Sequence, residues 1–165
     1  MALTFARHVT TGKGFPKRPE AGDQEFKLNI VVIFTSVDAT IAAVKMAGTL
    51  AEDLNARITL LVPIVVPYPL ALTRPSVPLD FQEKRFQDIA RECPADIHVQ
   101  LYLCREPLQT LKTVLRPHSL VIVGARKQLW PAREKSLARE LRNSGHEVIF
   151  TEADRSTVRR LYKRG

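Results

Sequence analysis

Cysteine is scarce in this sequence. Cys93 and Cys104 form neither a Cys-x-x-Cys pair nor a zinc knuckle. Two cysteines make no disulfide framework, so a reducing compartment, the cytoplasm, is the expected location. The four histidines lack the His-x-x-x-His spacing that metals use. We therefore expect no metal site and two buried, unreactive thiols.

Long hydrophobic runs and catalytic motifs are also missing. The longest apolar run, residues 60–66, is interrupted by Pro63 and is far shorter than the roughly 20 residues of a membrane-spanning helix. No serine lies in a Gly-x-Ser-x-Gly elbow, and no histidine is placed by sequence beside a carboxylate to activate one. The sequence therefore predicts neither a membrane span nor a catalytic residue, and at most slow ATP hydrolysis.

The hydrophobic residues, in contrast, form a regular pattern. In a chain of 165 residues with 45% hydrophobic content, short β-branched runs alternate with stretches of helical period. This alternation predicts one α/β domain, a three-layer α/β/α sandwich around a five-stranded parallel sheet. The strands are expected at residues 28–34, 58–66, 97–103, 120–123 and 147–150.

Several local features refine this prediction. Asp38 is the expected N-cap of the first helix, and Asn55 is its expected end. Pro63 indicates a bulge or the end of its strand. Residues 97–103 alternate between apolar and polar, which predicts a half-exposed strand at an edge of the sheet.

Positive charge is concentrated toward the two ends of the chain. The net charge is +8, and much of the excess lies before residue 27, between residues 126 and 142, and after residue 154. We predict a basic, mobile extension over residues 1–26, an α/β domain over residues 27–153 and a basic tail over residues 154–165.

The order of the motifs resembles that of the universal stress proteins. The matching segments are Leu61-Val-Pro-Ile-Val-Val-Pro67, Arg105-Glu-Pro107, Leu120-Val-Ile-Val-Gly124 and the end of the chain from Ser136 to Phe150. The resemblance implies a Rossmann-like, doubly wound sheet with strand order 3-2-1-4-5. It also implies an ATP site in the crevice between the first and fourth strands, where open α/β sheets bind ligands.

This chain departs from the family's nucleotide motif, Gly-x-x-Gly followed by a spacer and Gly-Ser/Thr. Lys127 stands at the second glycine, Lys135 stands at the third, and a threonine stands where ATP-binding members have an aspartate. Arg126 and Lys127 are either solvated loop charges or a substitute anion clamp. The candidate site residues for ATP or a small anion are Thr35, Ile64, Gly124, Arg126, Lys127 and Ser136.

Three functional hypotheses follow. The first is a non-enzymatic regulatory module of the stress response with weak or lost ATP binding, which acts as a homodimer through its last strand or through contact with an unknown protein partner. The second is a sensor that still binds ATP or another phosphate-bearing metabolite in the crevice. The third is a platform whose basic ends bind nucleic acid or an anionic membrane surface, which would make binding strongly dependent on salt.

Overall fold

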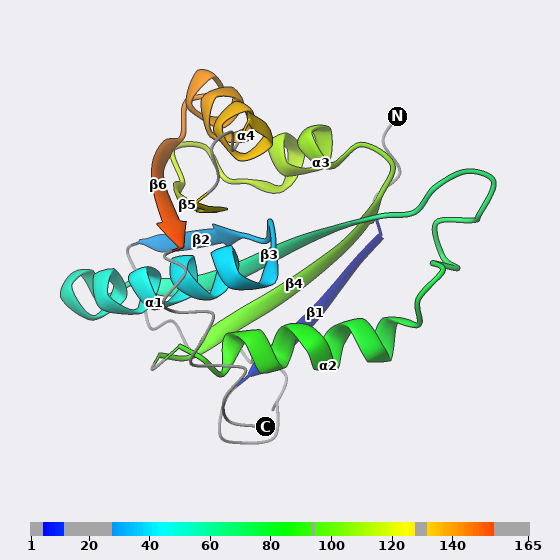
Figure 1. The fold of residues 1–165 in the computed structure, drawn as a ribbon, viewed down its shortest axis with the longest axis horizontal. Coiled ribbons are helices and arrows are strands. Elements are labelled where there is room, and N and C mark those ends of the chain that lie inside the picture. Colours follow the sequence, from blue (N-terminus) through cyan, green and yellow to red (C-terminus); the bar gives the residue numbers. More distant parts are fainter. Residues whose placement is uncertain (1–4, 12–27, 94, 128–131, 154–165) are drawn as a thin grey trace.

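A six-stranded sheet with helices on both faces forms the protein, as seen in a computed structural model that describes residues 5–11, 28–93, 95–127 and 132–153 (Figure 1). The strands are β1 (Phe5–Thr11), β2 (Asn29–Ile33), β3 (Arg57–Val65), β4 (Ile97–Cys104), β5 (Leu120–Arg126) and β6 (Glu147–Ala153). The helices are α1 (Val37–Leu54), α2 (Leu79–Ala90), α3 (Pro107–Val114) and α4 (Ala132–Asn143). No helix within the described ranges is long and apolar enough to cross a membrane.

Five of the strands run parallel. Their order in the sheet is β4-β3-β2-β5-β6, and every neighbouring pair among them is parallel. This is the predicted order 3-2-1-4-5, counted from the first parallel strand. The prediction of a doubly wound α/β sandwich is therefore confirmed, with one additional strand.

The helices lie in two layers. α1 and α2 cover one face of the sheet, and α3 and α4 cover the other (Figure 1). The larger core cluster lies under α1 and α2 and includes Val32, Leu60 and Phe86, whereas the smaller one lies under α3 and α4 and includes Leu111 and Leu141. Because the parallel strands are buried on both faces over most of their length, they show the continuous apolar runs seen in the sequence.

The extra strand corrects the prediction that residues 97–103 form an edge. β1 pairs antiparallel with β4 along seven residues, from Phe5 opposite Leu103 to Thr11 opposite Ile97. Backbone hydrogen bonds to a free strand edge require no apolar pattern, so β1 left no clear periodicity in the sequence. The remaining residues of the predicted N-terminal extension, and the tail after Ala153, lie outside the described part, so the domain boundaries stay predictions.

β3 continues through Pro63, contrary to the predicted bulge or strand end. Phe34 N–H donates to Leu61 O at 3.0 Å, which shows that Leu61 faces β2 with its backbone groups. Two residues later Pro63 faces the same side, but β2 has already ended at Ile33. The missing N–H of proline therefore costs no hydrogen bond to β2.

α1 begins two residues earlier than predicted. Ser36, with φ −141° and ψ 162°, is its N-cap, and Asp38 lies in the first turn instead. Asn55 ends the helix in the left-handed conformation at φ 48°, as the sequence indicated. An acidic side chain in the first turn complements the positive end of the helix dipole without capping it.

Candidate functional site

The carboxyl ends of β2 and β5 meet at the centre of the sheet, where the sequence placed the crevice. Thr35 lies two residues after the end of β2, and its Oγ1 donates a hydrogen bond of 2.7 Å to the carbonyl oxygen of Gly124 in β5. The N–H of Thr35 donates to Thr40 Oγ1 on α1 at 3.2 Å. The polar groups of Thr35 are therefore already paired within the protein.

Gly124 is required by packing at this point. A Cβ atom added to it would lie 2.1 Å from the carbonyl oxygen of Ala39 and 3.3 Å from its Cβ, so the first turn of α1 rests directly on β5. Any side chain here would displace the helix. The residue that best matched the nucleotide motif thus has a structural reason to be glycine, independent of any phosphate.

Arg126, another of the candidate site residues, forms an ion pair with Asp38. Its Nη2 lies 3.5 Å from Asp38 Oδ2, and the two side chains are 53% and 22% exposed. The positive end of α1, which in many α/β proteins attracts a phosphate, therefore has its own carboxylate beside it. A negative ligand would therefore compete with Asp38 for Arg126.

The structure does not bring the other three candidate residues into contact with Thr35 and Gly124 through a described hydrogen bond or ion pair. Lys127 is exposed just after β5, and Ser136 lies on the exposed side of α4. Ile64 is half-buried in β3 and packs against the larger core. Within the described residues, no hydrogen bond or ion pair joins Lys127, Ser136 or Ile64 to Thr35 or Gly124, and the loop at 128–131 lies outside them.

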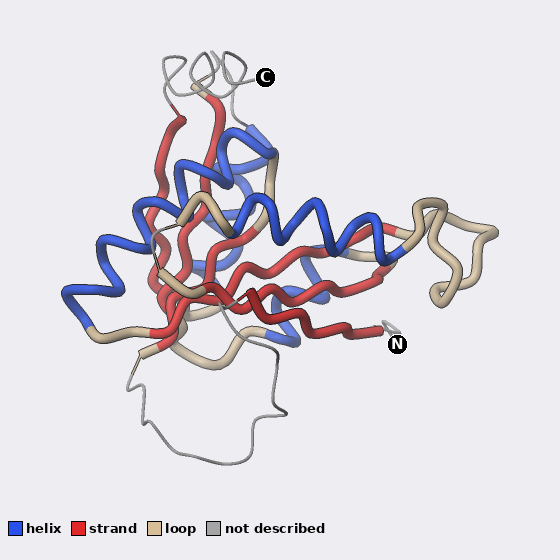
Figure 2. Tube along the Cα trace, turned by 90° about the horizontal axis from the view of Figure 1, so that it is seen from below, coloured by secondary structure: helices blue, strands red, loops and turns tan. Residues whose placement is uncertain are grey.

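Sequence reasoning missed the residues that hold this end of the sheet together. Thr40 is fully buried and accepts from Thr35, and its only signal was a polar residue on an otherwise apolar helix stripe. Arg105 donates to the carbonyls of Val66 and Leu70 and lies 4.0 Å over the ring of Tyr68. It thereby anchors the proline-rich loop, residues 66–78, which extends away from the rest of the chain (Figure 2).

The two thiols match their expected character. Cys93 and Cys104 are both buried and unpaired with each other. Burial raises the pKa of each thiol above its ordinary value, which disfavours the nucleophilic thiolate. Among the described residues, no group of three or more histidine, cysteine, aspartate or glutamate side chains is placed to hold a metal ion.

The architecture and this central crevice define the class of protein as a doubly wound α/β sandwich. No family model matches the chain, and no curated protein matches it. One solved structure that it resembles is described as "Crystal structure of universal stress protein in complex with cAMP", with a TM-score of 0.49 and 15% identity over 77% of this chain and 98% of that one. A likeness at this level does not say what this chain binds.

Proposed function

We propose that this protein is a non-enzymatic binding module of the universal-stress type, which acts through contacts with a second copy or another protein and binds ATP weakly or not at all. One observation carries the proposal. At the carboxyl ends of β2 and β5, Thr35 donates to the carbonyl oxygen of Gly124, and Arg126 pairs with Asp38 of α1. The buried hydroxyl of Ser36 is the exception, with no hydrogen-bond partner among the described residues.

The energetic balance supports weak ATP binding. A triphosphate in this crevice would have to break internal pairs and approach Asp38. Lys127 stands where the family motif has a glycine, whose lack of a Cβ lets its backbone N–H come close to a phosphate. Each lost charge-assisted hydrogen bond is worth about 1.5–3 kcal/mol. An exposed cation such as Lys127 returns only about 0.2–1 kcal/mol because water screens it. The loss therefore exceeds the gain.

Isothermal titration with MgATP at low salt tests this proposal. We expect no binding tighter than about 100 µM. The informative variant is Arg126→Gln, and its matched control is Arg74→Gln, because Arg74 is an exposed arginine in the distant proline-rich loop. A sub-micromolar constant that only Arg126→Gln weakens would overturn the proposal and favour the ATP-sensor hypothesis.

Self-association through β6 is the contact that the fold makes available. β6 lies at the end of the sheet, and no described strand pairs with its outer side. Val148, Ile149 and Phe150 remain half-buried there, so an apolar edge is open to pairing with another chain. We propose a symmetric dimer formed by this edge.

Light scattering at micromolar concentration checks the dimer. Ile149→Lys is expected to shift the protein to monomer, whereas Gln109→Lys, an exposed change on α3, is expected to leave the mass unchanged. Because Ile149 also packs against the larger core, circular dichroism should first establish that the variant is folded. A parent protein that is entirely monomeric would contradict the proposed dimer.

A further inference from the structure

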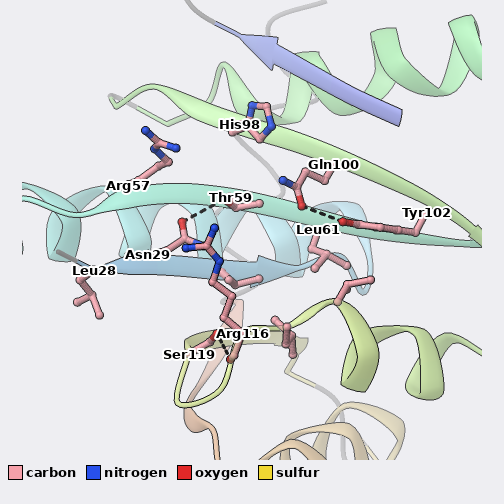
Figure 3. A pocket seen from close by; sticks show the side chains of 13 residues that line it. Leu28, Asn29, Arg57, Thr59, Leu61, His98, Gln100, Tyr102, Arg116 and Ser119 are labelled. Carbon is pink, nitrogen blue, oxygen red and sulfur yellow. Dashed lines mark hydrogen bonds between the residues drawn. The ribbon is translucent and has the colours of Figure 1, made fainter. Parts of the chain in front are cut away.

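A cavity of about 510 Å³ opens at the other end of the sheet, on the face that carries α3 (Figure 3). It lies where β2, β3 and β4 begin, away from the crevice discussed above. We call it the amino-end groove and define it by its polar lining residues: Asn29, Arg57, Thr59, His98, Gln100 and Arg116. Its size is typical of pockets that hold small molecules.

The groove exists because α3 is short. This helix spans eight residues, Pro107–Val114, and packs against the later parts of β3 and β4. Every second residue of a strand lies on this face. Along each of the three strands these residues are polar at the beginning, beyond the reach of α3, and apolar farther along, where the helix covers them. The three rows are Asn29, Val31 and Ile33 in β2, Arg57, Thr59 and Leu61 in β3, and His98, Gln100 and Tyr102 in β4.

Polar residues on the face of a parallel sheet are unusual, since such strands are normally apolar on both faces. The opposite face follows the usual rule, with Ile30, Ile58 and Ile97 all buried under the other helix layer. The apolar–polar alternation of β4, which the sequence suggested was an edge, thus has a different cause: its polar residues line the amino-end groove.

The charged side chains among the described lining residues are all basic. Arg57 and Arg116 contribute two permanent positive charges, and His98 is a third nitrogen-bearing side chain, whereas none of the described lining residues is acidic. Arg116 extends from the loop before β5 toward Asn29 and Thr59 (Figure 3). The planar guanidinium of arginine presents paired donors that fit the oxygens of an oxyanion.

The internal hydrogen bonds orient two amides as donors. Thr59 Oγ1 donates to Asn29 Oδ1 at 3.1 Å, and the Tyr102 hydroxyl donates to Gln100 Oε1 at 3.2 Å. Each bond uses the amide oxygen and leaves the amide NH₂ to donate elsewhere. The groove therefore offers the Arg116 guanidinium and amide N–H donors, which are the complement of a ligand rich in negatively charged oxygens.

We propose that the amino-end groove binds a small phosphate ester, no larger than a mononucleotide. Arg116 and the amides of Asn29 and Gln100 contact the phosphate. A phosphate has more acceptor oxygens and more charge than one carboxylate, which suits this number of donors. The apolar floor formed by Val31 and Leu61 receives the carbon skeleton of the ester.

Calorimetric titration of the full chain with ribose 5-phosphate at low salt tests the proposal. We expect a dissociation constant between about 10 µM and 1 mM for the parent protein and no heat with unphosphorylated ribose. Arg116→Gln should weaken binding tenfold or more, and Gln100→Leu should weaken it severalfold. Inorganic phosphate should compete with the sugar phosphate, since both use the same oxyanion contacts.

Two exposed arginines supply matched controls. Arg74→Gln in the proline-rich loop and Arg126→Gln beside the central crevice remove the same charge and should leave binding within twofold of the parent. Absence of binding, equal weakening by Arg116→Gln and Arg74→Gln, or tighter binding of a dicarboxylate such as malate would each overturn the proposal. None of these results would affect the function proposed above, because that rests on the opposite end of the sheet.

Discussion

The two ends of this sheet differ in how their polar groups are used. At the carboxyl end, Thr35 bonds to Gly124, and Arg126 faces Asp38, so these four residues are paired within the protein. At the amino end, the donors of the amino-end groove surround a cavity of about 510 Å³. The comparison teaches that side chains at the customary ligand position of an α/β sheet can be engaged with one another while a short helix leaves a cavity at the other end.

The largest expected effect tests the tight packing at the carboxyl end. Gly124→Ala places a Cβ against the backbone of Ala39, which cannot move without shifting α1, so we expect a loss of about 3 kcal/mol or more in the free energy of unfolding. Gly145→Ala is the control. It has no atom within 4 Å but a φ of +90°, and should cost about 1–2 kcal/mol. Urea unfolding measures both, and equal losses would contradict the proposed close approach.

A smaller effect tests the hydrogen bond that joins β2 to β5. Thr35→Val removes the donor to Gly124 O and should cost about 1–2 kcal/mol, because the carbonyl loses its partner in a half-buried position. Thr113→Val is the matched control, since its hydroxyl is exposed and bonds only to its own helix at Gln109 O. That change should stay within about 0.5 kcal/mol. If chemical denaturation shows the same loss of unfolding free energy for both variants, the hydrogen bond from Thr35 to Gly124 does not stabilise the contact between the ends of β2 and β5.

The smallest effect concerns pH and the amino end. His146 is buried just before β6, and burial, together with the nearby His118, lowers its pKa below the ordinary 6.5. As the pH falls, His146 therefore becomes protonated in the unfolded chain before it does in the folded protein. The contribution of neutral His146 to the free energy of unfolding is present above about pH 6.5 and is lost as the pH falls toward the lower pKa of the folded state. His146→Gln should flatten the stability profile between about pH 7 and pH 5.

A companion variant refines this pH prediction. His118→Gln removes the neighbouring positive charge but leaves His146 buried, so it should flatten the same profile only in part. Unfolding curves collected across the pH range would separate the two causes. An unchanged slope in His146→Gln would show that another group governs stability in this window.

Most of the fold was readable from the sequence because burial leaves a periodic signal. The five parallel strands and four helices appeared where apolar residues repeated at a period of two, in continuous runs or at helical spacing. β1 was not predicted, because it joins the sheet through backbone hydrogen bonds to β4 and these leave no periodic signal in the sequence. The N-cap of α1 was misplaced because Asp38 and Ser36 are both good N-cap residues, and only the backbone angles distinguish them.

The candidate site was less predictable. Motif spacing brought attention to Gly124 and Thr35, which do meet, but it could not show that they meet each other. Lys127, Ser136 and Ile64 were named by position in the motif and have no described bond to that pair. The sequence shows the polar residues at the beginnings of β2, β3 and β4. That they lie on one face of the sheet depends on the register of the three strands, which the sequence does not show.

The sequence by itself determined the class of fold, since the order of buried runs and amphipathic stretches permits few arrangements of a parallel sheet. The tertiary structure alone decided that Thr35 and Gly124 pair at one end of the sheet and that a cavity lies at the other. That outcome depends on the approach of Ala39 to Gly124 and on the reach of the eight-residue α3 across the sheet. Such distances arise between segments far apart in the chain, and local patterns of residues do not encode them.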